Sequence, residues 1–270
     1  MIELSGVSKT YAKSDRKAID SLSLSIPNGR IFGFLGPNGA GKTTTIRVFC
    51  GALEPDSGTV SIDGISMAQR PLDAKRRIGV VHDNPELFNR LKAMEYLNFI
   101  GDVFRIPAQE RRARIDEYAA RFGLSDVLSA SIGGFSRGMK QKLGLIASLI
   151  HDPANWVLDE PMVGLDPQSA FELKEIMRQR VKEGKCVFFS THVMEVAEKV
   201  CNQLAIIDKG RIIFTGTIED LRKRRESAGA AGPGEARAGD GRAREGGAEE
   251  DSLERLFLEL VDSSRESEGL

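Results

Sequence analysis

The spacing of apolar and polar residues changes several times along the chain and predicts different elements in turn. The first thirty residues alternate apolar and polar positions in IELSGV and SLSLSIP, and GTVSIDG does so after the turn-rich EPDSG. A period of two is typical of strands that bury one face, so we expect short antiparallel strands here. The segments IFGFL, RIGVV, NWVLDEP, KCVFFSTH and QLAIID are instead continuously apolar and are separated by helical patterns. Buried strands joined by helices indicate an α/β fold with a mostly parallel sheet.

A helical pattern interrupts this alternation between about residues 84 and 150. Both KAMEYLNFIGDVFR and AQERRARIDEYAARFG carry apolar residues at three- and four-residue spacing. This spacing places the apolar side chains on one face of a helix. We therefore expect a helical subdomain, residues 84–150, inserted into an α/β domain that spans residues 1–225.

The C-terminal part of the chain divides into two segments of different composition. Residues 226–250 are Gly, Ala, Glu and Arg with scarcely any large apolar side chain, so burial cannot offset their ordering entropy and we expect a disordered linker. The next segment, residues 251–263, reads as an amphipathic helix, and Asp251 and Glu254 are spaced like a capping box. We favour docking of this helix on the chain's own core, while contact with a second copy or a partner stays open.

Composition excludes several classes of partner and site. Of the 270 residues, 38 are Lys or Arg and 39 are Asp or Glu, so no overall field attracts nucleic acid or an anionic membrane. Cys50, Cys186 and Cys201 are far apart and form no C-x-x-C pair, which favours buried thiols in a reducing compartment over disulfides or a zinc site. No apolar stretch approaches the 18 or so residues of a membrane helix, and the start of the chain lacks a signal-peptide layout. If the protein works at a membrane, we expect another chain to span it.

A phosphate-binding loop follows the apolar run IFGFL. The sequence GPNGAGKTT at residues 36–44 fits the pattern G-x-x-x-x-G-K-[ST], and a helical segment comes next. Its glycines permit positive φ and let backbone N–H groups approach phosphate oxygens, Lys42 adds a positive charge, and Thr43 offers a hydroxyl to Mg²⁺. The alternative is a Gly-rich structural turn, which the strand, loop and helix order disfavours. The predicted nucleotide-binding residues of this loop are Gly36, Pro37, Asn38, Gly39, Ala40, Gly41, Lys42, Thr43 and Thr44.

Two carboxylates and a histidine end other predicted strands, where α/β proteins place their ligand crevice. Asp159 and Glu160 end the run WVL, and His192 ends KCVFFSTH. We expect Asp159 to be a direct or outer-sphere partner of Mg²⁺ and Glu160 to orient and deprotonate the attacking water. A solvated acidic pair is the plain alternative. His151 lies at a predicted helix end and is interpreted as a packed or capping residue.

A second candidate anion site lies at the start of a later helix. Ser136 and Gly138 begin that helix in FSRGMKQKLG, so a hydroxyl and backbone N–H groups face an anion. The phosphate loop of a chain already binds the phosphates of the nucleotide held by that chain. The second site therefore needs a ligand from another molecule. An ordinary serine N-cap explains the same residues equally well.

The order of these motifs resembles the ATP-binding subunits of ABC transporters over essentially residues 2–221. The motifs are the phosphate loop, the signature FSRGM, the strand WVLDE, GLD at residues 164–166 and STH at residues 190–192. The resemblance implies a P-loop NTPase core with an N-terminal antiparallel β subdomain and an inserted helical subdomain. It also implies ATP and Mg²⁺ as cofactors.

The same resemblance assigns roles across a head-to-tail dimer, either a homodimer or a heterodimer with another ATPase subunit. Ser136 and Gly138 of one chain would bind the γ-phosphate of ATP held by the other chain. His192 would contact the γ-phosphate, and Asp166 would help to join the two sites. Tyr11 matches the aromatic residue that stacks on adenine, with a plain strand tyrosine as the alternative.

Two positions depart from the usual pattern of this family. Arg137 and Met139 replace the second Gly and the Gln of LSGGQ, a wording similar to that of an exporter-dominated branch. The loop after RIGVV offers His82 and Asp83 where the family has a Gln that contacts Mg²⁺ and the membrane partner. We expect Asp83 to ligate Mg²⁺ through oxygen, although it is one methylene shorter and negatively charged.

These observations favour an ATPase subunit of an ABC exporter, located in the cytoplasm on the inner face of the membrane through a separate multi-spanning permease. ATP would close the dimer and hydrolysis would reopen it. One alternative is a soluble ABC-type ATPase acting on DNA, ribosomes or cofactor assembly, but the chain shows no coiled-coil heptads, basic patch or cysteine cluster, and we expect no nucleic-acid partner. Another is an ATP-dependent regulator without useful turnover. The transported substrate and import instead of export stay open.

Overall fold

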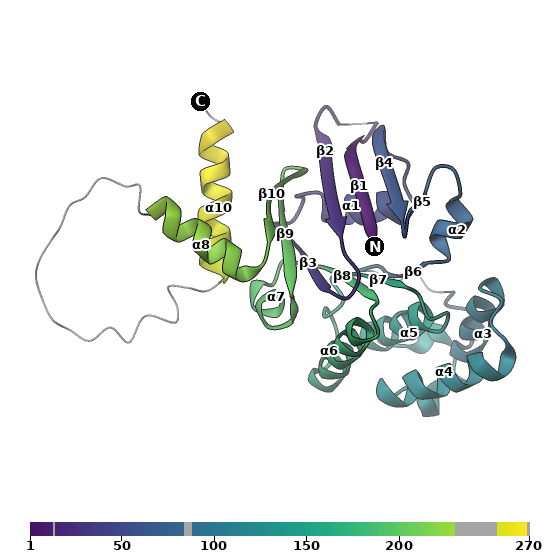
Figure 1. Cartoon of the computed structure of the whole chain (residues 1–270). Helices are drawn as coiled ribbons and strands as arrows, with labels where there is room; N and C mark the ends of the chain where they lie inside the picture. Colours follow the sequence, from purple (N-terminus) through teal and green to yellow (C-terminus); the bar gives the residue numbers. More distant parts are fainter. Residues whose placement is uncertain (13, 84–87, 230–252, 269–270) are drawn as a thin grey trace, which may run out of the picture.

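The computed structural model describes residues 1–12, 14–83, 88–229 and 253–268 (Figure 1). Its N-terminal strands form an antiparallel sheet in the order β2-β1-β4-β5. The strands are β1 (Ile2–Thr10), β2 (Lys17–Ile26), β4 (Ser57–Ile62) and β5 (Ile65–Ser66). Every pair in this sheet is antiparallel, as the alternating sequence pattern predicts.

A second sheet has the order β10-β9-β3-β8-β7-β6. Its strands are β3 (Ile31–Leu35), β6 (Ile78–Val81), β7 (Asn155–Asp159), β8 (Cys186–Thr191), β9 (Gln203–Asp208) and β10 (Arg211–Gly216). All neighbours in it are parallel except the pair of β9 and β10. All residues of β3, β7 and β8 are buried, which explains why their sequences are continuously apolar.

Helices cover both faces of the parallel sheet. Helix α1 (Lys42–Phe49) lies between the two sheets, and its Ile46 and Phe49 pack with Phe188 of β8. Helices α5 (Arg137–Leu149) and α6 (Pro167–Lys182) cover the opposite face, where the neighbouring Val187 and Phe189 point. The two faces of β8 therefore belong to two separate cores, and the ends of its neighbours β3 and β7 are held between them.

The chain between β6 and β7 is mostly helical, on the side of the molecule away from the C-terminal helix (Figure 1). It contains α3 (Ala93–Val103), α4 (Ala108–Arg121), two 3₁₀ turns (Ser125–Val127 and Ile132–Gly134) and α5. Leu97, Ile115 and Leu143 of the three helices are buried in one core. A short helix, α2 (Pro71–Lys75), precedes β6.

The C-terminal region corrects two expected boundaries. Helix α8 (Ile218–Gly229) runs beyond Glu226, where the disordered linker was expected to begin, because Glu226 and Ala228 are good helix formers even without apolar periodicity. The rest of that linker, residues 230–250, lies outside the described residues, as does Asp251 of the expected capping box. Helix α10 (Leu253–Glu268) passes the expected end at residue 263, since its last turns are polar and carry no periodic signal.

Helix α10 docks on the chain's own core. Leu253, Leu256, Phe257 and Val261 pack against α7 (Met194–Val200), β10 and α8. The same cluster contains Leu35, the last residue of β3. No helix in the described part of the chain has the length and apolarity needed to cross a membrane.

Candidate active site

The phosphate loop joins β3 to α1 at the carboxyl end of the parallel sheet. Gly39 and Gly41 have φ values of 80° and 112°, and a Cβ at Gly41 would lie 2.5 Å from the carbonyl oxygen of Ala18. Glycine is therefore required at residue 41 both by conformation and by space. Gly41 supplies no side chain to cap α1, so the first N–H groups of this helix face the loop and form an anion site.

Lys42 lies inside this loop. Its ammonium donates to the carbonyl oxygens of Gly36 at 2.7 Å and Pro37 at 3.3 Å. The side chain is only 7% exposed, and burial lowers the pKa of Lys42 from its usual range. A charge this poorly solvated interacts strongly with any phosphate that enters the loop.

Asp159 ends β7 beside Ser190 of β8, in the register that pairs these two residues. The hydroxyl of Ser190 donates to Oδ1 of Asp159 at 2.5 Å. The carboxylate is buried, and its Oδ2 has no hydrogen-bond partner among the described residues. A buried carboxylate oxygen of this kind fits a hard cation or its bound water, and the exposed Thr43 on the first turn of α1 offers a second oxygen.

Glu160 follows Asp159 with a left-handed backbone conformation, φ 48°. Its N–H donates to the carbonyl oxygen and the hydroxyl of Ser190, both at 3.2 Å, which holds this uncommon conformation for a non-glycine residue. Its Oε1 lies 2.9 Å from Nδ1 of His192 and 3.8 Å from Nζ of Lys42. Because β3, β7 and β8 are neighbours, the structure brings the phosphate loop, both carboxylates and the histidine to one edge of the sheet.

Tyr11 lies on the outer side of the phosphate loop. Its hydroxyl is 3.3 Å from the hydroxyl of Thr44. Tyr11 also lines a pocket of about 400 Å³ together with Pro37, Asn38 and Gly39. An aromatic ring in this position, partly exposed beside the loop, has room to stack on a planar base.

Ser136 and Gly138 belong to a different part of the molecule, the start of α5. Ser136 caps this helix by accepting a hydrogen bond from the N–H of Met139 at 3.2 Å. No hydrogen bond among the described residues joins Ser136 or Gly138 to the phosphate loop. The starts of α1 and α5 are therefore separate in a single chain, and Ser136 acts there as the N-cap of α5.

Asp83 is placed beside α5. Its Oδ1 lies 3.7 Å from Nη2 of Arg137, and both side chains are exposed. The neighbouring His82 is within the electrostatic influence of Asp159, although burial is the main effect and lowers the pKa of His82. The sequence did not predict the contact of Ser190 with Asp159, since the motif STH does not indicate a partner for its serine. The pairing of β7 with β8 is what reveals that contact.

Comparisons with known proteins agree with this arrangement. Residues 19–163 match the family described as ABC transporter. The chain is 36% identical over 230 residues to the ABC transporter ATP-binding protein NatA of Bacillus subtilis (strain 168), covering 84% of this chain and 94% of that protein. It is 38% identical over 215 residues to the Nod factor export ATP-binding protein I of Burkholderia orbicola (strain AU 1054), covering 80% of this chain and 70% of the relative.

A solved structure described as the ATP-binding subunit of an ABC transporter superposes on the whole fold. Its TM-score is 0.84 at 28% sequence identity, and the match covers 97% of this chain and 99% of that one. The family match, the sequence relatives and the shared fold agree with the geometry of the loop, the two carboxylates and the histidine. The chain therefore belongs to the ABC transporter family, as an ATP-binding subunit with ATPase activity.

Proposed function

We propose that this chain hydrolyses ATP to drive export through a separate membrane-spanning permease, on the cytoplasmic face of the membrane. One observation carries the proposal: Lys42, Asp159 and Glu160 meet with His192 at the ends of three adjacent strands. This set provides for both binding and cleavage of a phosphate chain. The Nod factor relative is named for export, and export is the direction that we infer for this chain.

Each side chain has a role that follows from its position. The N–H groups of the loop and the Lys42 ammonium bind and neutralise the β- and γ-phosphates. Glu160 accepts a proton from the attacking water, while His192 holds its carboxylate and contacts the γ-phosphate. Thr43, Asp83 and Asp159 would hold Mg²⁺ through oxygen, and when bound there the ion supplies charge neutralisation on the phosphates. Tyr11 stacks on the adenine.

The second anion site makes this a two-chain mechanism. Ser136 and Gly138 at the start of α5 bind the γ-phosphate of ATP held by a second ATPase subunit, identical or related. Support comes from the observation that, within the described part of one chain, no hydrogen bond joins Ser136 or Gly138 to the phosphate loop. ATP binds the closed pair more tightly than the separated chains, so it shifts the population toward the pair until hydrolysis removes the γ-phosphate.

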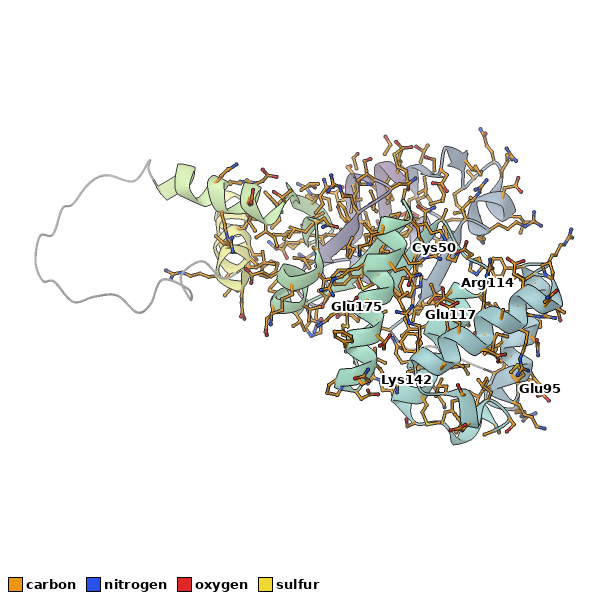
Figure 2. All side chains as sticks on the ribbon, turned by 60° about the horizontal axis from the view of Figure 1, so that its bottom comes forward. Cys50, Glu95, Arg114, Glu117, Lys142 and Glu175 are labelled. Carbon is orange, nitrogen blue, oxygen red and sulfur yellow. The ribbon has the colours of Figure 1, made fainter. Side chains whose placement is uncertain are left out.

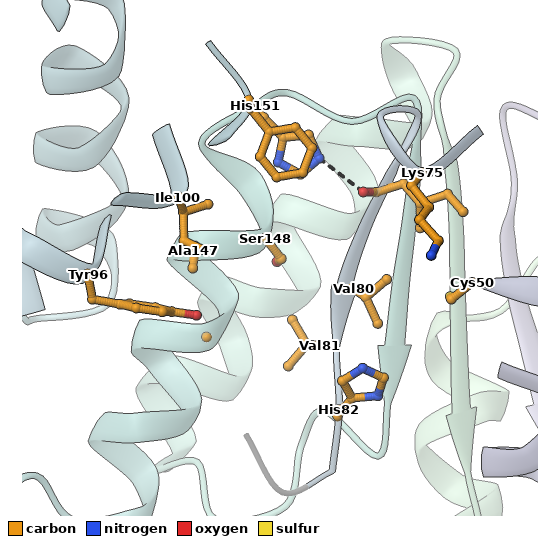
Figure 3. Close-up of a pocket in the computed structure, with 13 residues that line it drawn as sticks. Cys50, Lys75, Val80, Val81, His82, Tyr96, Ile100, Ala147, Ser148 and His151 are labelled. Atoms are coloured by element: carbon orange, nitrogen blue, oxygen red, sulfur yellow. Dashed lines mark hydrogen bonds between the residues drawn. The ribbon is translucent and has the colours of Figure 1, made fainter. Parts of the chain in front are cut away.

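The surface that we assign to the permease contains aromatic side chains of the helical region. The exposed rings of Phe88 and Phe99 pack edge to face with their centroids 5.8 Å apart. The ring centroids of Phe88 and Tyr96 are 6.2 Å apart. Tyr96, the partner of Phe88, also lines a pocket of about 340 Å³ together with His82 (Figure 3). Exposed aromatic rings beside a pocket are suited to binding a short helix of the permease. A movement of this helical region would thereby be transmitted to the permease in the membrane.

The catalytic part of the proposal is tested by Glu160→Gln. We expect turnover to fall by about 10²- to 10⁴-fold while ATP binding persists, because general-base catalysis contributes about that much. The matched control is Glu175→Gln, the same chemical change on the exposed face of α6 (Figure 2). Turnover by Glu160→Gln that equals the parent rate would remove Glu160 from the reaction.

The transport part is tested by purifying the chain with its partners from native membranes in mild detergent. We expect a multi-spanning protein in near-stoichiometric amount. Phe88→Asp together with Phe99→Asp should release it. A reproducible ribosomal or DNA-bound complex in its place would contradict the export proposal.

A further inference from the structure

The first turns of α5 contact the loop that follows Glu160, the residue that we propose as the general base. This loop, residues 161–166, begins directly after Glu160. Nζ of Lys142 lies 2.6 Å from Oδ2 of Asp166, and Nε2 of Gln141 donates to the carbonyl oxygen of Pro161 at 3.4 Å. A Cβ at Gly138 would lie 2.6 Å from the carbonyl oxygen of Gly164, so the two backbones are in close contact. Three successive points of the loop thus touch the same helix.

The ion pair of Lys142 (labelled in Figure 2) and Asp166 is the charged member of this set. The Lys142 side chain is 15% exposed and that of Asp166 is 48% exposed, so the lysine is largely removed from water. Asp166 also caps α6: its Oδ1 accepts from the N–H of Ser169 at 2.9 Å and its Oδ2 from the Ser169 hydroxyl at 2.8 Å. Lys142 and Ser169 hold the pKa of Asp166 well below its usual range. The carboxylate is therefore charged, and its hydrogen bonds hold it in one orientation. Most exposed ion pairs lack such a fixed geometry.

The start of α5 and the 161–166 loop, which these contacts connect, each adjoin a group with a proposed function. Ser136 and Gly138, which we propose as ligands for the ATP of the second chain, begin α5. Glu160, which we propose as the base for the chain's own ATP, immediately precedes the 161–166 loop. A shift of α5 on binding the second chain's ATP is therefore transmitted to the loop next to Glu160 through the contacts described above.

We propose that Lys142 is a positioning residue for the two-chain ATP site: its ammonium holds Asp166 so that the start of α5 and the 161–166 loop move as one unit. This inference rests on the proposed function, because the ligand at Ser136 comes from the second chain. Lys142 touches neither nucleotide nor metal in this account and acts through Asp166 alone. Without it, Asp166 keeps its bonds to Ser169 and α6 keeps its cap, but the loop loses its charged link to α5.

The test measures dimer formation, in a Glu160→Gln background that retains ATP. Lys142→Met removes the charge and keeps most of the packing volume of the side chain. We expect it to weaken Mg-ATP-dependent dimerisation, measured by sedimentation velocity, by about tenfold or more, as for loss of a hydrogen bond to a charged group. Binding of a fluorescent ATP analogue by the single chain should stay unchanged, and Lys142→Arg should restore most of the dimer affinity.

Ser169→Ala is the matched control. It removes the other side-chain donor to the same Oδ2 atom but leaves the link to α5 in place. We expect dimer affinity to remain near that of the parent.

Four results would overturn the inference. They are unchanged dimerisation in Lys142→Met, an equal loss in Ser169→Ala, a loss of ATP binding by the single Lys142→Met chain, and failure of Lys142→Arg to restore affinity. If the Glu160→Gln parent itself stays monomeric in Mg-ATP, the proposed two-chain site fails and this inference falls with it. Because the parent is measured first, that result is separate from failure of the role of Lys142.

Discussion

Nδ1 of His192 and Oε1 of Glu160 lie 2.9 Å apart, although 32 residues separate them in the sequence. The same oxygen lies 3.8 Å from the ammonium of Lys42. Two nitrogen groups therefore face the carboxylate that we propose as the general base, one directly after β8 and one from the phosphate loop. A base held in this way needs little reorganisation when water arrives.

Removal of the imidazole should weaken catalysis more than binding. For His192→Ala we expect turnover to fall by about 10²-fold or more, comparable to loss of one electrostatic contact at a reacting centre. ATP affinity should change much less, since the loop and Lys42 remain. Steady-state phosphate release together with equilibrium nucleotide binding separates the two effects. A variant with normal turnover would show that the contact with Glu160 is only structural.

The residues that we propose as metal ligands can be distinguished by Mn²⁺ binding in the presence of ATP, measured by electron paramagnetic resonance. Asp159→Asn should weaken Mn²⁺ binding by at least about tenfold, and Ser190→Ala should also weaken it because Ser190 orients the Asp159 carboxylate. We expect a smaller loss for Asp83→Asn, since Asp83 is exposed and lies beside Arg137. A loss for Asp83→Asn equal to that for Asp159→Asn would make Asp83 a full ligand.

Acid should destabilise the fold through His151. This ring stacks on Phe104 with centroids 3.7 Å apart, and its Nε2 lies 3.0 Å from the carbonyl oxygen of Ile78. Burial lowers the pKa of His151 from 6.5 to about 4. Between these values the unfolded chain binds a proton that the folded chain does not, so stability is full above pH 6.5 and falls as the pH decreases toward 4.

The effect amounts to at most about 3 kcal/mol across that window. Urea unfolding measured at a series of pH values should show it as a steeper loss of stability in the parent than in His151→Gln, which cannot titrate. Parallel curves for the two proteins would assign the acid sensitivity to other groups.

The C-terminal helix offers a paired test of docking. Leu256 is 3% exposed within the cluster that includes Met194 and Leu35, whereas Leu258 on the same helix is 53% exposed. Leu256→Ala should lower the free energy of unfolding by about 2–3 kcal/mol, and Leu258→Ala by less than about 0.5 kcal/mol. Chemical denaturation measures both. Equal effects would show that α10 is not docked on the face described here.

The sequence predicted those parts of the fold and site that depend on local order. The five buried residues of β3, the glycine loop and α1 follow one another directly, so the site for phosphate could be placed without a structure. The position of Asp159 at the end of a buried strand, with Glu160 directly after it, was predicted in the same way. Each of these features lies within one short segment.

Contacts between distant segments could not be predicted in this way. Ser190 meets Asp159 only because β7 and β8 pair in one register, and Lys142 meets Asp166 only because α5 packs on the loop after β7. Both pairs join residues of ordinary type whose partner is set by tertiary packing. The last turns of α10 were missed for a different reason: a polar helical segment has no apolar face for periodicity to detect.

The left-handed conformation of Glu160 bears on why a glutamate occupies this position. A non-glycine residue at φ 48° carries backbone strain of about 1 kcal/mol or more, which glycine would relieve. Glu160→Gly therefore removes the side chain that we propose as the general base and at the same time relieves the backbone strain. A requirement for ATP hydrolysis is therefore the reason we infer for a glutamate at a backbone position that glycine would adopt without strain.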